Sequence, residues 1–184
     1  MRYSLMNTVK YTTLMAALVA GLTLGGGETM AQTVNEAPTS LTETYGDWVV
    51  RCVSPAAAEG QPAPARVCEM TQELQQQRTG QRVLALSVQK AESGGRLTVV
   101  APFGLLLAEG VKLSVGETPL VALGFTTCLP AGCIAVSDLE VAAMNALAAG
   151  DQVVVEMTDT NAQPLKLNVS LRGFTAAWNK LTSL

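Results

Sequence analysis

The 184-residue sequence contains no histidine. Histidine is the commonest general base and the commonest metal ligand in proteins, so Ser-His-Asp and Cys-His catalytic sites are excluded. A structural zinc ion would need all four cysteines, which in an exported chain more often form two disulfides. We therefore expect no histidine-dependent catalytic site, no metal and no cofactor.

Basic and aromatic residues are also scarce. The chain has 12 Lys and Arg against 15 Asp and Glu, a formal net charge of −3, and only 4% aromatic residues. Nucleic-acid binding needs clustered cations for the phosphates and aromatic side chains that stack on bases, and no stretch of the sequence collects them. We expect no nucleic-acid partner.

Long apolar runs are lacking after the N-terminus. Residues 1–10 carry Arg2 and Lys10 but no acid, and the apolar run 14–24 that follows is too short to remain in a bilayer. This pattern predicts a secretory signal peptide over residues 1–31, cleaved near Ala31. No later segment reaches the roughly 20 apolar residues of a membrane helix, so we expect a mature chain without a transmembrane segment. Its predicted location is the periplasm, the cell surface or the medium.

The four cysteines fall into two pairs along the chain. Cys128 and Cys133 flank a Leu-Pro-Ala-Gly turn between two apolar runs, where Pro and Gly favour a tight reversal. Cys52 and Cys68 stand at the two ends of an Ala/Pro-rich loop, residues 54–66. The pairing Cys52–Cys68 and Cys128–Cys133 is therefore favoured, although spacing does not exclude the two other pairings.

The remaining pattern predicts a mainly β chain. We expect a flexible polar N-terminal arm over residues 32–44 and a single domain over residues 45–184. In this domain, Trp48 either anchors the core or stacks on a ligand, and the core interpretation is favoured. Strands are expected where apolar residues alternate between turn signals: 48–53, 83–88, 97–101, 111–115, 120–125, 151–157 and 165–171.

Two helices and one short apolar run complete the prediction. Residues 138–149 should form a mostly buried helix that begins at a capping box made by Ser137 and Glu140. A terminal helix should place Phe174, Ala177, Trp178 and Leu181 against the sheets, since these residues are spaced at helical intervals. The run 103–108 fits a strand covered on both sides better than it fits an exposed docking patch.

Several of these positions together resemble the invasion-associated locus B family. They follow one another over nearly the whole predicted mature chain: Gly46-Asp47-Trp48, Cys52, Cys68, Pro102-Phe103-Gly104, Gly110-Val111, Phe125, Cys128, Gly132-Cys133 and Gly173-Phe174. The resemblance implies an exported bacterial protein with an immunoglobulin-like β-sandwich, one or two short helices and no catalytic residues. The family takes its name from a member linked to the entry of a pathogen into host cells.

Three functions fit these observations. The first is a non-catalytic interaction module of the envelope or of host-cell association, with a protein partner and with binding residues that the sequence does not identify. The alternative is a thiol-redox element that uses Cys128 and Cys133. The third is a hydrolase with paired carboxylates, for which the available acids are Asp47, Glu69, Glu140, Asp151 and Glu156.

Overall fold

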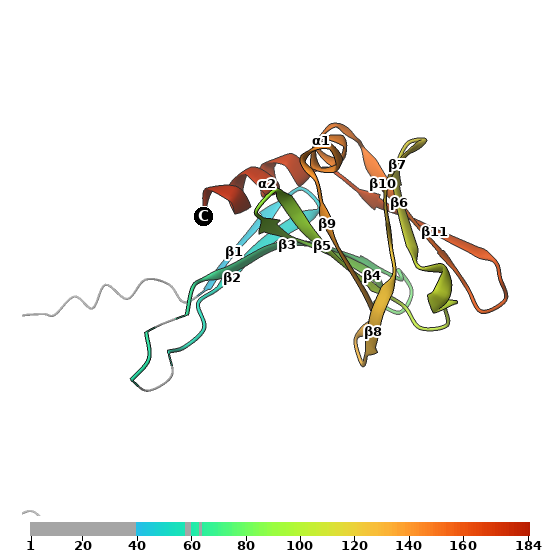
Figure 1. The fold of residues 1–184 in the computed structure, drawn as a ribbon, viewed down its shortest axis with the longest axis horizontal. Helices are drawn as coiled ribbons and strands as arrows, with labels where there is room; N and C mark the ends of the chain where they lie inside the picture. Colours follow the sequence, from blue (N-terminus) through green and yellow to red (C-terminus); the bar gives the residue numbers. More distant parts are fainter. Residues whose placement is uncertain (1–39, 58–59, 63) are drawn as a thin grey trace, which may run out of the picture. The chain divides into compact units, whose positions relative to one another are not determined.

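The chain forms two antiparallel sheets in the computed structural model, which describes residues 40–57, 60–62 and 64–184 (Figure 1). The larger sheet has seven strands in the order β1 (Ser40–Tyr45), β2 (Trp48–Val53), β3 (Val67–Gln75), β4 (Arg82–Ala91), β5 (Gly94–Ala101), β9 (Gly132–Leu139) and β8 (Phe125–Leu129). The smaller sheet has four strands in the order β11 (Pro164–Ser170), β10 (Gln152–Thr158), β6 (Val111–Val115) and β7 (Thr118–Leu123).

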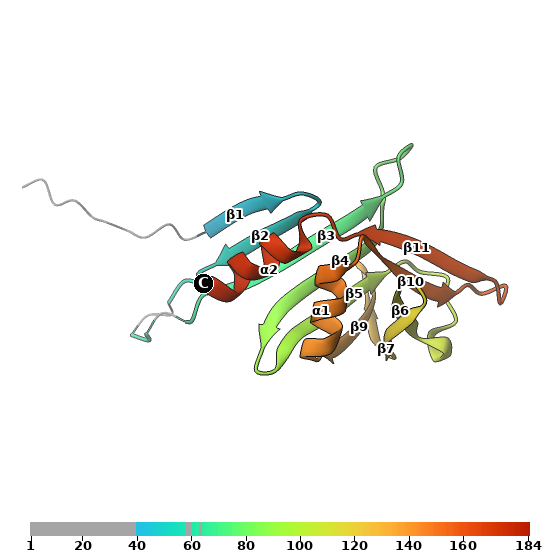
Figure 2. The ribbon, with the colours of Figure 1, turned by 90° about the horizontal axis from the view of Figure 1, so that it is seen from above.

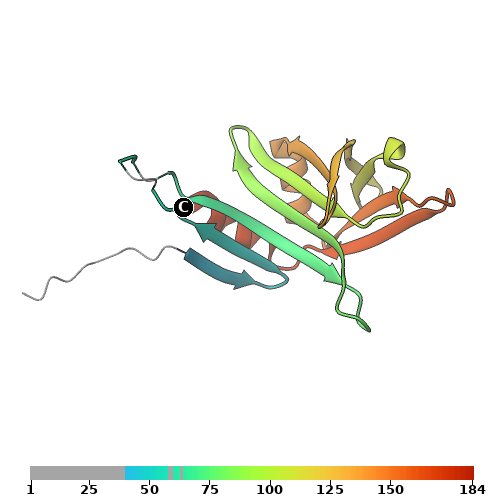
Figure 3. The same cartoon turned by 90° about the horizontal axis from the view of Figure 1, so that it is seen from below.

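One face of the larger sheet carries the core. Alternation in β4 sends Leu84, Leu86 and Val88 to that face, and each is at most 2% exposed. Helix α2 (Phe174–Ser183) covers β1 to β4, and helix α1 (Val141–Ala149) contacts β5, β7 and β9. Figure 2 shows α2 lying along β2 and β3, with α1 beside β5. In Figure 3 both helices, α1 and α2, lie behind the larger sheet.

The mainly β class, the presence of two helices and most of the expected strands agree with the sequence prediction. The expected strand 120–125 is instead divided at Gly124 between β7 and β8, which belong to different sheets. The immunoglobulin-like order is not specifically confirmed. In an immunoglobulin sandwich four strands face three and Greek-key connections join the sheets. Here β1 to β5 instead lie side by side in chain order, which is a meander, before β9 and β8 extend the same sheet.

The predicted flexible arm needs correction in its second part. Residues 40–44 belong to β1, which pairs with β2 from Ser40↔Val53 to Tyr45↔Trp48. This strand can be polar because none of its side chains is fully buried. Leu41, Glu43 and Tyr45 on its inner face are half-buried, and the other three are exposed. An edge strand with one half-covered face gives a weak apolar alternation. Residues 32–39 and the predicted signal peptide lie outside the described residues.

The predicted start of the first helix is wrong. Ser137 and Asp138 still belong to β9, where they pair with Leu97 and Arg96, and α1 begins only at Val141. Glu140 takes the N-cap position, and no side-chain hydrogen bond caps the helix. The extended conformation prevails because the β5 ladder continues there and Arg96 binds both carboxylate oxygens of Asp138, at 2.7 and 3.1 Å.

The expected burial of α1 is also wrong. Its buried residues are Met144 and Leu147, while Val141 is 58% exposed. The helix has apolar residues around most of its circumference, so its sequence does not indicate which face packs. α2 agrees with its prediction, with Phe174, Ala177 and Leu181 buried and Trp178 half-buried against the core.

Candidate functional site

Both disulfides have the favoured pairing, and each joins two residues directly opposite one another on neighbouring strands. Cys52 on β2 pairs with Cys68 on β3, and Cys128 on β8 pairs with Cys133 on β9. Their surroundings differ. Cys52 is 1% exposed and Cys68 is half-buried, whereas Cys133 is 3% exposed and its partner Cys128 is exposed.

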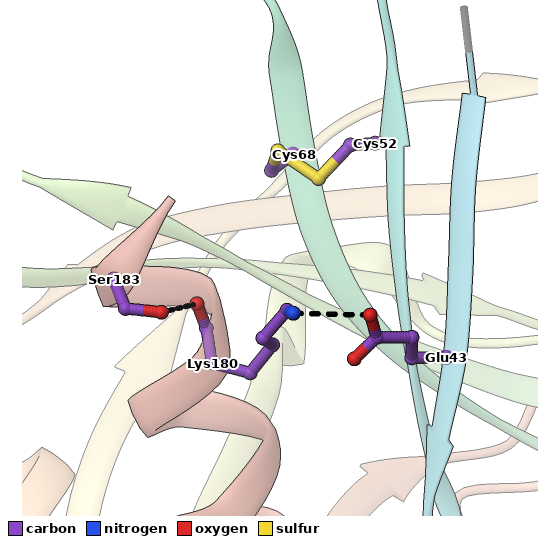
Figure 4. The surroundings of a disulfide bond; sticks show 5 residues. All are labelled: Glu43, Cys52, Cys68, Lys180 and Ser183. Atoms are coloured by element: carbon purple, nitrogen blue, oxygen red, sulfur yellow. Dashed lines mark hydrogen bonds and ion pairs between the residues drawn. A yellow bond between two sulfur atoms is a disulfide. The ribbon is translucent and has the colours of Figure 1, made fainter. Parts of the chain in front are cut away.

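A polar tie joins β1 to α2 near the first disulfide (Figure 4). Lys180 Nζ lies 3.0 Å from a Glu43 carboxylate oxygen, and the Tyr45 hydroxyl donates to the other oxygen at 2.5 Å. These hydrogen bonds, that from Tyr45 foremost, hold the pKa of Glu43 below its ordinary value. The same hydrogen bond raises the pKa of Tyr45. The cluster fastens the edge strand to the terminal helix and is not arranged around a cavity.

The two motifs that begin and end the resemblance lie against each other. We call this contact the clasp: Gly46-Asp47-Trp48 on one side and Arg172-Gly173-Phe174 on the other. Its side chains make two strong contacts. Arg172 donates to both oxygens of Asp47, at 2.5 and 3.1 Å, and the rings of Trp48 and Phe174 meet edge to face at 5.1 Å.

The glycines of the clasp allow its two backbones to touch. A Cβ on Gly46 would lie 2.5 Å from the Arg172 carbonyl oxygen, and one on Gly173 would collide with the Tyr45 carbonyl. Trp48 is 1% exposed, and its Nε1 donates to the Ser170 carbonyl at 3.0 Å, which confirms its place in the core. These motif residues hold the fold together, and Asp47 also lines an open pocket of about 290 Å³ beside Arg51 and Glu73.

The acids considered for hydrolysis are engaged elsewhere. Asp47 is bound by Arg172, Glu69 accepts a hydrogen bond from Ser87 at 2.5 Å, and Glu156 pairs with Lys166 at 3.0 Å. The Arg172 hydrogen bonds hold the pKa of Asp47 below its ordinary value, so this carboxylate is a poor general acid.

The two remaining acids differ in position. Asp151 is exposed just before β10. Glu140 lines an open groove of about 370 Å³ between β7 and α1, where the other acid, Asp138, is bound by Arg96. Among the described residues, no group of three Cys, Asp or Glu side chains could hold a metal ion.

An exposed apolar segment stands out at the end of β5. We call residues 102–108 the apolar loop. Its sequence, Pro-Phe-Gly-Leu-Leu-Leu-Ala, has no charged side chain. Phe103 is 61% exposed, Leu107 44% and Leu106 37%. The prediction of a strand covered on both sides is therefore wrong, because three large apolar side chains of this segment are exposed.

The apolar loop is held in place from beneath. Leu105 is 8% exposed and forms a β-bridge with Asp159. The Leu106 amide donates to the Thr158 carbonyl at 2.9 Å, and the Thr160 amide donates to the Gly104 carbonyl at 3.0 Å. These contacts with the β10–β11 hairpin fix the backbone and direct Leu105 inward. The sequence carries two signals for a loop, Pro102 and Gly104, but it does not indicate which apolar residues are left outside.

Comparison with known proteins gives one consistent result. The sequence model of the invasion associated locus B (IalB) protein family matches residues 48–182. An invasion protein B homolog of Brucella abortus is 36% identical over 148 residues, which cover 79% of this chain and 81% of that protein. Invasion protein B of Bartonella bacilliformis is 33% identical over 160 residues, with 83% and 80% of the two chains covered.

A solved structure supports the same relationship. The crystal structure of invasion associated protein b from Bartonella henselae matches with a TM-score of 0.66 and 34% sequence identity. The match covers 78% of this chain and 95% of that one. Within the described residues, no helix is long and apolar enough to cross a membrane. From its family match, its relatives and its fold, the chain belongs to the invasion associated locus B family.

Proposed function

We propose that this protein is an exported, non-catalytic interaction module that binds a protein partner through the apolar loop. The observation that carries the proposal is the exposure of Phe103, Leu106 and Leu107 on a fixed backbone. Exposed clusters of large apolar side chains on a water-facing protein commonly mark an interaction site.

The energetics favour binding at this loop. Complete burial of one such side chain contributes about 1.5–3 kcal/mol, so three of them can supply much of the affinity of a specific complex. Because the β10–β11 hairpin already fixes the backbone, little conformational entropy is lost when a partner binds. The absence of charge in residues 102–108 also leaves no ion to desolvate there.

Two further observations support export. Disulfides persist in oxidising compartments, and this chain has two of them and no free cysteine among its described residues. Residues 1–31 have the pattern of a secretory signal peptide. The relatives are named as invasion proteins, so we place the proposed partner in the bacterial envelope or on a host cell.

A capture experiment tests the proposal. The mature protein (residues 32–184) serves as bait for envelope extract and host-cell lysate, alongside a Phe103→Ser/Leu107→Ser variant. A Val141→Ser variant is the matched control, because Val141 is an equally exposed apolar residue on α1. We expect the serine pair in the loop to abolish a specific capture that wild type and the Val141 variant both retain. If all three baits retain the same proteins, or none exceeds an inert β-sandwich, the apolar loop is not a binding site.

A further inference from the structure

The Cys128–Cys133 disulfide lies at the outer edge of the larger sheet. β8 is the last strand of that sheet, and it pairs only with β9. Leu129 pairs with Gly132, so just two residues, Pro130 and Ala131, form the turn beyond the disulfide. The exposed cysteine is on the edge strand and the buried one is on the inner strand.

The position of Cys128 on the edge strand determines the direction from which a thiolate can attack the disulfide. A thiolate attacks one sulfur along the S–S axis, from the side opposite to the sulfur that leaves. The axis here runs across the strands, from Cys133 on β9 to Cys128 on β8. Because no strand of the described residues lies beyond β8, the approach to Cys128 comes from the open edge of the sheet.

The other disulfide is more enclosed. Cys52 is on β2, and β1 lies beyond it, with Leu41 directly opposite Cys52. Cys68 is on β3, where it is half-buried and lines a cavity of about 300 Å³ together with Lys90. The Cys52 end of the bond is therefore covered by β1, and the Cys68 end is less exposed than Cys128.

We propose that Cys128–Cys133 is a thiol-exchange site at which the Cys128 sulfur accepts an external thiol, either a small thiol of the glutathione class or a protein dithiol. The incoming thiolate forms a bond to Cys128 Sγ, the Cys128–Cys133 bond breaks, and Cys133 leaves with the electron pair and takes a proton from water. A second external thiolate then displaces the first from Cys128. The external thiols are oxidised to a disulfide, and the cysteine pair is reduced to two thiols.

The fold should survive this exchange. β9 remains paired with β5 from Gly95↔Leu139 to Ala101↔Cys133, because these backbone hydrogen bonds do not depend on the S–S bond. Arg82 of β4 donates from Nη2 to the Ala131 carbonyl at 2.7 Å, so the turn keeps an anchor when the bond is open. The reduced hairpin is thus held in place for re-oxidation.

The experiment compares the two disulfides within one native molecule. The mature protein is exposed to reduced glutathione in one arm and to a thioredoxin-type dithiol protein in the other. It is then quenched in acid, alkylated with a maleimide and mapped by mass spectrometry. Cleavage after Arg51, Arg66 and Lys112 separates the peptide of Cys52 from the peptide shared by Cys128 and Cys133. Near-ultraviolet circular dichroism reports whether the tertiary packing persists.

We expect Cys128–Cys133 to open at least about tenfold faster than Cys52–Cys68 while the dichroism is unchanged. In the glutathione arm the mixed disulfide should be on Cys128 and the maleimide on Cys133. Reaction in only one arm identifies which thiol class the site accepts. Equal or faster opening of Cys52–Cys68, opening only with loss of the dichroism, glutathione on Cys133, or no opening in either arm would each overturn the proposal. The Phe103→Ser/Leu107→Ser variant should exchange like wild type, so this test and the capture experiment fail independently.

Discussion

At the scale of single residues, the clasp explains what the glycine and aromatic positions of the motif do. Gly173 has a φ of +89°, which side chains rarely adopt, and its Cα faces the Tyr45 carbonyl at a distance that excludes a Cβ. Gly80 has a φ of +67°, but a Cβ added there would meet no atom within 4 Å, so it shares the backbone constraint without the contact. A comparison of the two glycines therefore distinguishes the cost of backbone strain from the cost of a steric clash with the added Cβ.

Gly173→Ala should lower the free energy of unfolding by roughly 3 kcal/mol, because it adds a collision to the strain. Gly80→Ala should lower it by about 1 kcal/mol, since only the strain remains. Urea titrations of both variants measure the two costs. Equal costs would show that the clasp yields to a methyl group and is not close-packed.

The ion pair of the clasp predicts a dependence on pH. The pKa of Asp47 is lowered in the folded protein, chiefly by its hydrogen bonds from Arg172. The folded state therefore binds that proton less readily than the unfolded state, and the pair stabilises the protein above the ordinary carboxyl pKa of 3.8. This stabilisation is lost as the pH falls through the lowered folded-state value.

Asp47→Asn should accordingly have a lower urea midpoint than wild type at pH 7, and the difference should shrink as the pH falls below 3.8. Glu109→Gln is the control, because Glu109 is exposed and makes no ion pair with any described residue. The control should follow wild type at every pH. A difference for Asp47→Asn that persists unchanged at acid pH would mean that geometry, not charge, is what Asp47 contributes.

At the scale of elements, the sequence predicts best where local signals and tertiary contacts agree. β4 places Leu84, Leu86 and Val88 on one face and has a sheet partner on each side, and α2 has one apolar face to bury. The β8–β9 hairpin has Pro130 and Gly132 at its turn and a disulfide across it. These three elements could all be predicted.

Prediction fails where a tertiary partner prevails over a local preference. A capping box was available at Ser137 and Glu140, but Arg96 and the β5 ladder keep Ser137 and Asp138 in the strand. The apolar loop has the composition of a strand, yet its partners are backbone groups of a hairpin about 55 residues further along the chain. The sequence therefore favours a covered strand over an exposed patch at this segment, since exposure depends on neighbours that the sequence does not reveal.

The terminal helix is anchored to the larger sheet by its first residue. Phe174 begins α2, is 1% exposed and meets Trp48 edge to face. Phe174→Ala should lower the free energy of unfolding by about 3–5 kcal/mol, because it leaves a cavity between the helix and β2. Thr175→Ala, next in the helix and exposed, should cost well under that amount, although it loses a hydrogen bond to the Ala148 carbonyl. Comparable losses in urea titrations would contradict the anchoring role of Phe174.

At the scale of the whole molecule, we expect the two disulfides to have different roles, one mainly in stability and the other in reaction with external thiols. Cys52–Cys68 cross-links interior strands over a sequence separation of 16, and Cys128–Cys133 cross-links a hairpin over a separation of 5. A cross-link restricts the unfolded chain more when it closes a longer loop. The interior bond should therefore contribute more to the stability of the fold, and the edge bond should be the one that can open without unfolding.

Replacing Cys52 and Cys68 together by Ser should accordingly cost about 1 kcal/mol more than replacing Cys128 and Cys133, because the entropy of the unfolded chain depends on the logarithm of loop length. Burial acts in the same direction, since Cys52 is 1% exposed and Cys68 half-buried, whereas Cys128 is exposed. Urea titrations of the two double variants measure the difference, with the slope m of each variant checked for two-state behaviour. If the Cys128/Cys133 variant is clearly the less stable, the edge hairpin contributes to the core beyond its cross-link, and its disulfide could not open at the small cost that thiol exchange requires.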